Sequence, residues 1–142
     1  MTPSDDNKKT TTYLGDKTSA KPMQDRIPSK KTGTLGESWK LKCKIEDKFA
    51  TIPVATQIVV GRTMDDDVVD FDLTPYDAYH YGVSRRHAIM SLLDGFLYIE
   101  DLGSTNGTRI NGFQLTSKQK YRLRDGDEVE FARLRMIIKF EP

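Results

Sequence analysis

The sequence predicts an all-β protein, a sandwich or barrel built from many short strands. Short apolar runs recur along most of the chain, and Asp-Gly or Asn-Gly pairs separate several of them. Such pairs supply the positive φ angles that tight hairpin turns need. No segment has the apolar spacing of an amphipathic helix three turns long. Closely spaced short strands with hairpin turns are typical of β-sandwiches and barrels.

The first expected strand begins near Glu37. Its apolar residues alternate with charged ones, a period of two that indicates a strand buried on one face. Five later apolar runs predict further strands at 58–60, 88–93, 96–99, 129–131 and 134–140. The alternating apolar residues of the first strand are Trp39, Leu41, Cys43 and Ile45, and the turn signals are Asp94-Gly95, Asn106-Gly107, Asn111-Gly112 and Asp125-Gly126.

The chain divides into a tail, residues 1–36, and one domain, residues 37–142. The tail is rich in Thr, Lys, Ser, Asp and Pro and has few apolar residues. Such a segment cannot bury enough apolar surface to offset its ordering entropy, so we expect it to be disordered. It carries seven Lys or Arg against four Asp or Glu, which leaves fifteen and seventeen for the domain. The tail is therefore weakly basic and the domain weakly acidic.

Composition disfavours several classes of protein. The formal net charge of +1 is too small for a general nucleic-acid binder that neutralises phosphates. No run of about 18 apolar residues exists, so we expect no membrane insertion, and the first residues lack the apolar centre of a signal peptide. The single cysteine, Cys43, cannot form an internal disulfide, which favours a reducing compartment. We expect a cytoplasmic protein.

Catalysis is a weak interpretation of the polar residues. Ser84 and His87 are close in sequence, and Asp101 is a candidate third member of a nucleophilic triad. The segment 82–86, however, lacks the second glycine of a nucleophile elbow and precedes an expected strand rather than a helix. We therefore expect no enzyme and no cofactor.

Metal binding is weaker still. The two histidines and Cys43 do not have the spacing of a zinc site. The acidic run Asp65-Asp66-Asp67 lacks the glycine and the glutamate that a calcium loop of the EF-hand type requires. We expect a solvated acidic loop here and no bound metal.

Three expected loops carry groups that suit an oxyanion. Arginine offers a planar fork of donors that matches phosphate oxygens. Serine and threonine hydroxyls and loop N–H groups add neutral donors. If the loops converge, they form a small pocket for one doubly charged oxyanion. The residues are Arg62 in the first loop, Ser84 and Arg85 in the second, and Ser104, Thr105 and Asn106 in the third.

The order and spacing of these pieces resemble one known family, the forkhead-associated (FHA) domain, over roughly residues 39–140. The resemblance implies a β-sandwich of about eleven strands that binds phosphothreonine in partner proteins without catalysis. The matching pieces are Gly61-Arg62, Ser84-Arg85-Arg86-His87, Asp101 to Thr108, Asn111-Gly112, and Gly126-Asp127 with Phe131.

The resemblance also implies roles for the candidate residues. Arg62 should pair with the phosphate, and Ser84 should donate its hydroxyl to it. Arg85 should help hold the phosphate or the peptide, and Thr105 should contact the phosphate or the threonine methyl. Asn106 should hydrogen-bond the peptide backbone.

Other positions should support the site without contacting the ligand. His87 should be a buried residue that braces the recognition loops, and Arg86 should face solvent. Gly61, Gly107, Asn111 and Gly126 should serve turn geometry.

The layout of tail and domain is similar to that of small bacterial FHA regulators. In these, a kinase phosphorylates a threonine of the tail, which then binds its own domain. The resemblance implies Thr10, Thr11 or Thr12 as phosphorylation sites and a Ser/Thr kinase as a partner. The alternative is a phosphate-independent interaction or scaffold domain on the same fold. The aromatic residues of segment 72–81 should pack over the site or present a partner surface.

Overall fold

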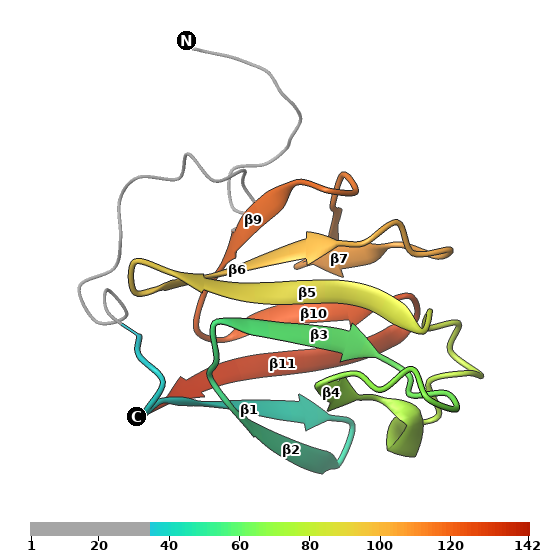
Figure 1. Ribbon diagram of the computed structural model, residues 1–142, viewed down its shortest axis with the longest axis horizontal. Helices are drawn as coiled ribbons and strands as arrows, with labels where there is room; N and C mark the ends of the chain where they lie inside the picture. The colour runs from blue at the N-terminus through green and yellow to red at the C-terminus, as the bar shows by residue number, and fades with distance from the viewer. Residues whose placement is uncertain (1–34) are drawn as a thin grey trace, which may run out of the picture.

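Alternating burial along the strands gives two β-sheets that pack face to face in the computed structural model, which describes residues 35–142 (Figure 1). One sheet has six strands in the order β2-β1-β11-β10-β7-β8, and the other has five in the order β4-β3-β5-β6-β9. The predicted sandwich of about eleven strands is confirmed. The strands are β1 (Lys40–Ile45), β2 (Lys48–Pro53), β3 (Gln57–Gly61), β4 (Phe71–Asp72), β5 (Arg86–Leu93), β6 (Phe96–Asp101), β7 (Thr108–Ile110), β8 (Phe113–Gln114), β9 (Lys120–Leu123), β10 (Asp127–Phe131) and β11 (Leu134–Glu141).

The strands with clear apolar patterns lie where the sequence predicts them. In β1, Leu41, Cys43 and Ile45 are buried and the lysines between them face outward. The five later runs correspond to β3, β5, β6, β10 and β11. Periodicity did not reveal β2, β4, β7, β8 and β9. Four of these have only two to four residues, too few to show a period of two, and β2 has an exposed face that includes Phe49.

The core fills the space between the two sheets. Leu41, Ile138 and Phe131 of one sheet and Met90 and Ile99 of the other have no exposed surface. Burial of each such side chain stabilises the fold by about 1.5–3 kcal/mol.

The chain joins the sandwich at Leu35. The N–H group of Leu35 donates to the carbonyl of Gly95 over 2.8 Å, and its side chain belongs to the core. Gly95 lies in the turn between β5 and β6, where Asp94 and Gly95 have the positive φ angles that the turn signal predicts, 51° and 83°. Residues 35 and 36, which composition alone assigns to the tail, therefore lie on the domain. Thr10, Thr11 and Thr12 lie outside the described residues.

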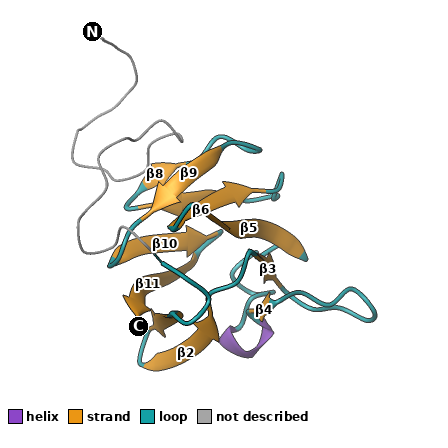
Figure 2. Cartoon of the chain, turned by 60° about the vertical axis from the view of Figure 1, so that its left-hand side comes forward, coloured by secondary structure: helices purple, strands orange, loops and turns teal. Residues whose placement is uncertain are grey.

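The loops with the candidate residues gather at the opposite end of the sandwich (Figures 1 and 2). Strands β3 and β6 end there and β5 and β7 begin there, because β5 runs antiparallel to both β3 and β6. The segments 62–85 and 102–107 and the β10–β11 turn at 132–133 therefore lie at one edge. The only helix among the described residues is η1 (Thr74–Tyr76), and none of them forms a helix long and apolar enough to cross a membrane.

Candidate anion-binding site

Gly61 lets two backbones meet at the edge of the site. The pairing of β3 with β5 shifts register between Val60 and Gly61. A Cβ atom on Gly61 would lie 1.9 Å from the carbonyl oxygen of Arg85, so only glycine fits. The N–H group of Arg62 donates to that same oxygen over 3.1 Å. Gly61 therefore lies within a strand, where it permits close approach, and not in the turn expected from the sequence.

The guanidinium of Arg62 is held by two contacts. Its Nε donates to the carbonyl of Val83 over 2.8 Å, and its Cζ lies 5.1 Å from the ring centroid of Tyr79. Its Nη1 lies 3.8 Å from the sulfur of Met64, a weak acceptor. No carboxylate within residues 35–142 pairs with Arg62. Its outer donors are therefore fixed in place and available for an anion.

Ser84 presents a hydroxyl donor. Its Oγ accepts the backbone N–H of Thr105 over 3.1 Å, so the hydroxyl proton must point elsewhere. No described residue accepts that proton. The same hydrogen bond joins the second loop to the third. The side chain of Thr105 is exposed.

Asn106 joins the same two loops at a second point. Its Nδ2 donates to the carbonyl of Gly82 over 3.0 Å. Gly82 has a φ of 85°, and a Cβ there would lie 2.6 Å from this nitrogen. The side chain of Asn106 is exposed, and its Oδ1 receives no hydrogen bond from the described residues. Asn106 therefore keeps an acceptor and one N–H for a ligand.

His87 is a buried residue that hydrogen-bonds both the second and the third loop. It has no exposed surface, and its Nδ1 accepts the N–H of Ser84 over 3.0 Å. Since Nδ1 accepts, Nε2 carries the proton and donates to the carbonyl of Gly107 over 2.8 Å. Burial lowers the pKa of His87, although the Gly107 carbonyl and the charge of Asp101 oppose that shift. The imidazole is therefore neutral, and its ring packs edge-on against Phe131.

Asp101 organises the third loop. Its carboxylate accepts the hydroxyls of Ser104, Thr108 and Ser117 over 2.6–2.7 Å. It also accepts the N–H groups of Gly103 and Ser104. Burial alone would raise the pKa of Asp101, but these hydrogen bonds outweigh it and lower the pKa to about 2. The carboxylate stays ionised and shapes the loop that carries Thr105.

The three residues of the catalytic interpretation do not form a relay. The Nδ1 of His87 accepts a backbone N–H of Ser84, so it cannot take the proton of the Ser84 hydroxyl. Asp101 binds donors of its own loops and makes no hydrogen bond to the imidazole. The Ser84–His87 pair and the His87–Asp101 pair therefore both lack the hydrogen bonds that activate a nucleophile.

Hydrogen bonds thus join the three loops that carry Arg62, Ser84, Thr105 and Asn106. Arg85 contributes its backbone carbonyl to the site, and its side chain is exposed. The side chain of Arg86, the first residue of β5, is also exposed, as expected.

The supporting positions differ among themselves. Gly107 has a φ of 87° and accepts His87 through its carbonyl. Asn111, with a φ of 49°, lies in the turn between β7 and β8, where its Nδ2 donates to Asp127 over 3.0 Å. Gly126, with a φ of 86°, also lies in a turn. All three residues have a positive φ, Asn111 and Gly126 lie in turns, Gly107 lies in the loop before β7, and Asn111 is tied to the β10 side of the sheet.

Two residues outside the sequence motifs contact the loops of the site. Tyr79 is 78% exposed, and its ring lies against the guanidinium of Arg62. Arg133, in the β10–β11 turn, donates through Nη2 to the carbonyl of His80 and through its N–H to that of Tyr81. Neither residue lies in a motif, so only spatial contact identifies them.

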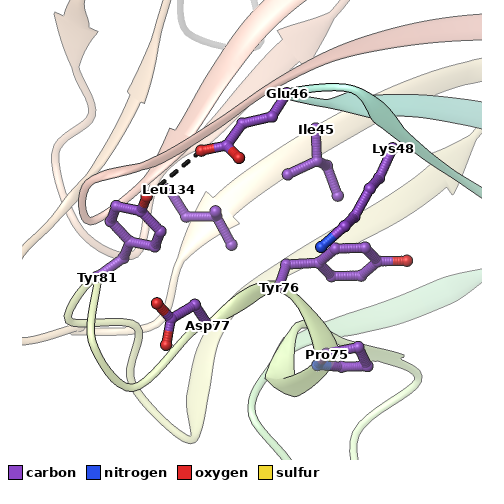
Figure 3. A pocket seen from close by; sticks show the side chains of 8 residues that line it. All are labelled: Ile45, Glu46, Lys48, Pro75, Tyr76, Asp77, Tyr81 and Leu134. Carbon is purple, nitrogen blue, oxygen red and sulfur yellow. Dashed lines mark hydrogen bonds between the residues drawn. The ribbon is translucent and has the colours of Figure 1, made fainter.

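A small hollow lies at this end of the sandwich, between the β1–β2 turn, η1 and the start of β11 (Figure 3). Its volume is about 190 Å³. The hydroxyl of Tyr81 donates to Glu46 across it over 3.3 Å. The lining residues are Ile45, Glu46, Lys48, Pro75, Tyr76, Asp77, Tyr81 and Leu134.

Comparisons with known proteins identify the same family that the sequence motifs resemble. The family model of the FHA domain matches residues 58–132. Protein FraH of Nostoc sp. is 35% identical over 88 residues, which are 61% of this chain and 30% of FraH. The glycogen accumulation regulator GarA of Mycolicibacterium smegmatis is 35% identical over 82 residues, 58% of this chain and 45% of GarA. The chain spans less than half the length of these relatives.

Solved structures share the fold. One, from a structural and functional analysis of phosphothreonine-dependent FHA domain interactions, has a TM-score of 0.57 and 27% identity. The match covers 72% of this chain and 98% of that one.

Proposed function

Because this chain belongs to the FHA-domain family, a family of interaction modules, we propose that it binds phosphothreonine-containing segments of proteins in Ser/Thr kinase signalling. One observation carries the proposal: Arg62 hydrogen-bonds the residue next to Ser84, Ser84 is tied to the third loop, and neither donor has an anionic partner among the described residues. Phosphothreonine brings about −1.5 to −2 charges and three acceptor oxygens. The FHA domains of the solved structure above interact in a phosphothreonine-dependent manner, which supports the same ligand here.

Each site residue then has a chemical role. Arg62 pairs with two phosphate oxygens, and Ser84 donates its hydroxyl to one of them. The exposed guanidinium of Arg85 adds charge at the rim. The side chain of Thr105 lies against the phosphate or the threonine methyl group. Asn106 uses its free Oδ1 and N–H on the backbone of the peptide. Unphosphorylated threonine leaves these donors without acceptors, and the affinity for it is therefore low.

The substitution Arg62→Ala tests the proposal. We expect phosphopeptide binding to fall by more than tenfold, since a hydrogen bond to a charged group contributes roughly 1.5–3 kcal/mol and Arg62 offers more than one. The measurement is a fluorescence titration with a degenerate peptide library in phosphothreonine and unmodified forms. Arg86→Ala, which removes a neighbouring exposed arginine, is the matched control and should bind like the wild type.

The outcomes separate the two function classes. Loss of binding in a folded Arg62→Ala variant, with Arg86→Ala unaffected, supports the phosphate reader. Equal affinity for the phosphorylated and unmodified libraries contradicts it and favours a phosphate-independent interaction domain.

The chain's own tail is a further ligand that we propose for this site, through phosphorylated Thr10, Thr11 or Thr12. Leu35 bonds Gly95 in the turn after β5, at the end of the sandwich opposite the site. The length of β5 therefore approximates the distance from Leu35 to the site: eight residues at about 3.4 Å each, or roughly 27 Å. If the tail is disordered, as its composition predicts, a segment of some 22 residues has an average end-to-end distance of about 26 Å, close to that length, and tethering would give millimolar effective concentrations. Lys8 and Lys9 also complement the exposed Asp65 and Asp66 beside the first loop.

Phosphorylation of the full-length chain tests the self-binding. We expect the amide signals of Arg62, Ser84 and Asn106 to shift on phosphorylation by an amount that does not depend on protein concentration. The phosphorylated chain should also bind the phosphothreonine library at least tenfold more weakly. A chain with alanine at the three tail threonines is the control. Unchanged library affinity after phosphorylation contradicts the self-binding and leaves the phosphate reader intact.

A further inference from the structure

The outward surface of the six-stranded sheet carries a group of lysines around two exposed apolar side chains. We call it the lysine face. It covers β1 and its two neighbours, β2 and β11, which flank β1 in the sheet. None of its side chains shares a hydrogen bond, ion pair or ring contact with Arg62 or Ser84. The lysine face consists of Lys40, Lys42, Lys44, Phe49, Ile137 and Lys139.

The strand register arranges these residues in rows. Lys44 of β1 pairs with Phe49 on one side and with Ile137 on the other. In the next row, Lys42 lies directly opposite Lys139. Apolar surface is thus concentrated around Lys44, at the end of β1 that leads to the loops. Away from it along the strand, Lys42 and Lys139 carry positive charge, and in the last row Lys40 lies opposite Glu141.

Most of this charge has no partner within the described residues. Lys42 lies 3.9 Å from Glu141, with both side chains half exposed, and its ammonium is 4.9 Å from the ring of Phe49. Lys40, Lys44 and Lys139 have no carboxylate within ion-pair distance in residues 35–142. The neighbouring carboxylates Glu128 and Glu130 of β10 are occupied by Arg135, at 3.3 Å each.

The arrangement works against the stability of the isolated domain. Like charges directly opposite on neighbouring strands are destabilising, and Lys42 faces Lys139 in this way. Phe49 is 57% exposed and Ile137 is 39% exposed, so two large apolar side chains also remain in water. A partner that brings carboxylates and an apolar group would relieve both costs at once.

We propose that the lysine face binds an acidic, extended segment of a partner protein, with carboxylates at alternating positions and an apolar residue at one end. Along β1 the lysines recur at every second residue, about 6.8 Å apart. An extended segment repeats its side chains at the same distance, so its carboxylates can meet successive lysines. Its apolar residue then packs on Phe49 and Ile137. The chain's own tail has the wrong charge for this surface, since it is net basic.

A pair of peptides tests the spacing. The first alternates three glutamates with serines and ends on leucine, and the second has the same composition with the glutamates consecutive. Fluorescence anisotropy should show the alternating peptide binding at least threefold more tightly. In an NMR titration its shifts should fall on β1, β2 and β11 and not on Arg62 or Ser84. Equal affinity for the two peptides contradicts the proposal.

Charge reversal tests the residues. In K42E/K139E, like charges still face each other, although the half-exposed contact of Lys42 with Glu141 is lost. The domain should therefore still fold, with slightly lower stability, whereas affinity for the alternating peptide should fall at least tenfold. Lys118→Glu, the same change at an exposed lysine outside the face, should leave affinity as it is. Binding of phosphothreonine peptides should survive in both variants, which separates this face from the anion site. An unaffected K42E/K139E variant overturns the proposal.

A single reversal distinguishes a binding role from a structural one. Lys139→Glu replaces a repulsive pair with an attractive one, so it should raise the melting temperature while it weakens binding of the acidic peptide. A lower melting temperature would mean that Lys139 serves the fold and contradicts the proposal. Two further titrations, with phosphatidylserine vesicles and with duplex DNA, should show weaker binding than the alternating peptide. Tighter binding to either assigns the face to a lipid surface or to nucleic acid instead.

Discussion

At the scale of single residues, hydrogen bonds within the protein decide which polar atoms of the site remain available for a ligand. Ser84 and Asn106 each give one polar atom to the opposite loop and keep others for a ligand. Arg62 uses Nε on a backbone carbonyl and rests on Tyr79, which fixes the guanidinium before any ligand arrives. Such preorganisation reduces the entropy that binding must overcome.

Gly61→Ala should destabilise the domain, because the new methyl group would meet a backbone oxygen at 1.9 Å. Overpacking of this kind costs about 1–3 kcal/mol, and here a backbone atom must move. Chemical denaturation measures the change, and phosphopeptide affinity should fall with it as Arg62 and Arg85 separate. Gly36→Ala is the control, since nothing lies within 4 Å of a Cβ there. Equal stability of the two variants would contradict the close approach.

At the scale of elements, two buried polar residues join loops that the strands leave apart. His87 connects the start of β5 to the loop before β7 through both ring nitrogens. Asp101, at the end of β6, accepts donors from the same loop and from Ser117 before β9. Because β5 and β6 are neighbours in one sheet, these two residues transmit the rigidity of the sheet to the loops.

Asp101→Asn should destabilise the domain by roughly 2–4 kcal/mol at neutral pH, since an amide cannot accept all the donors that the buried carboxylate satisfies. The pKa of Asp101 is lowered to about 2 from its ordinary 3.8, so its ionised form stabilises the fold above pH 4. That contribution, about 2 kcal/mol, is lost as the pH falls from 4 towards 2.

Urea denaturation at several pH values measures this dependence. The difference in unfolding free energy between wild type and Asp101→Asn should shrink over that range. A difference independent of pH would contradict the role of the carboxylate charge. Ser117→Ala, which removes one of its donors, should show a smaller effect of the same sign.

At the scale of the whole molecule, the two sheets enclose the single cysteine. Cys43 has no exposed surface and lies in the middle of β1, paired with Ala50 on β2 and Ile138 on β11. Burial raises the pKa of its thiol to about 12, so the nucleophilic thiolate is rare at neutral pH. Reagents can reach Cys43 only when the sheets separate.

Alkylation of Cys43 should therefore report global unfolding. We expect the native rate at pH 8 to be at least about a thousandfold slower than in the unfolded chain, because domains of this size are stable by 5–15 kcal/mol. Mass spectrometry of the iodoacetamide adduct measures it. Fast labelling in native buffer would show that β1 opens locally.

The sequence by itself determined the fold class and the turns, and it named the candidate donors for an anion. Alternation along β1 and the Asp-Gly and Asn-Gly pairs are local patterns, and local patterns are visible in a linear chain. The tertiary structure decided what depends on register and contact: that Gly61 admits the carbonyl of Arg85, that Tyr79 lies against Arg62, and that Lys139 faces Lys42. These residues are distant in sequence, and only the pairing of strands in two sheets brings them together.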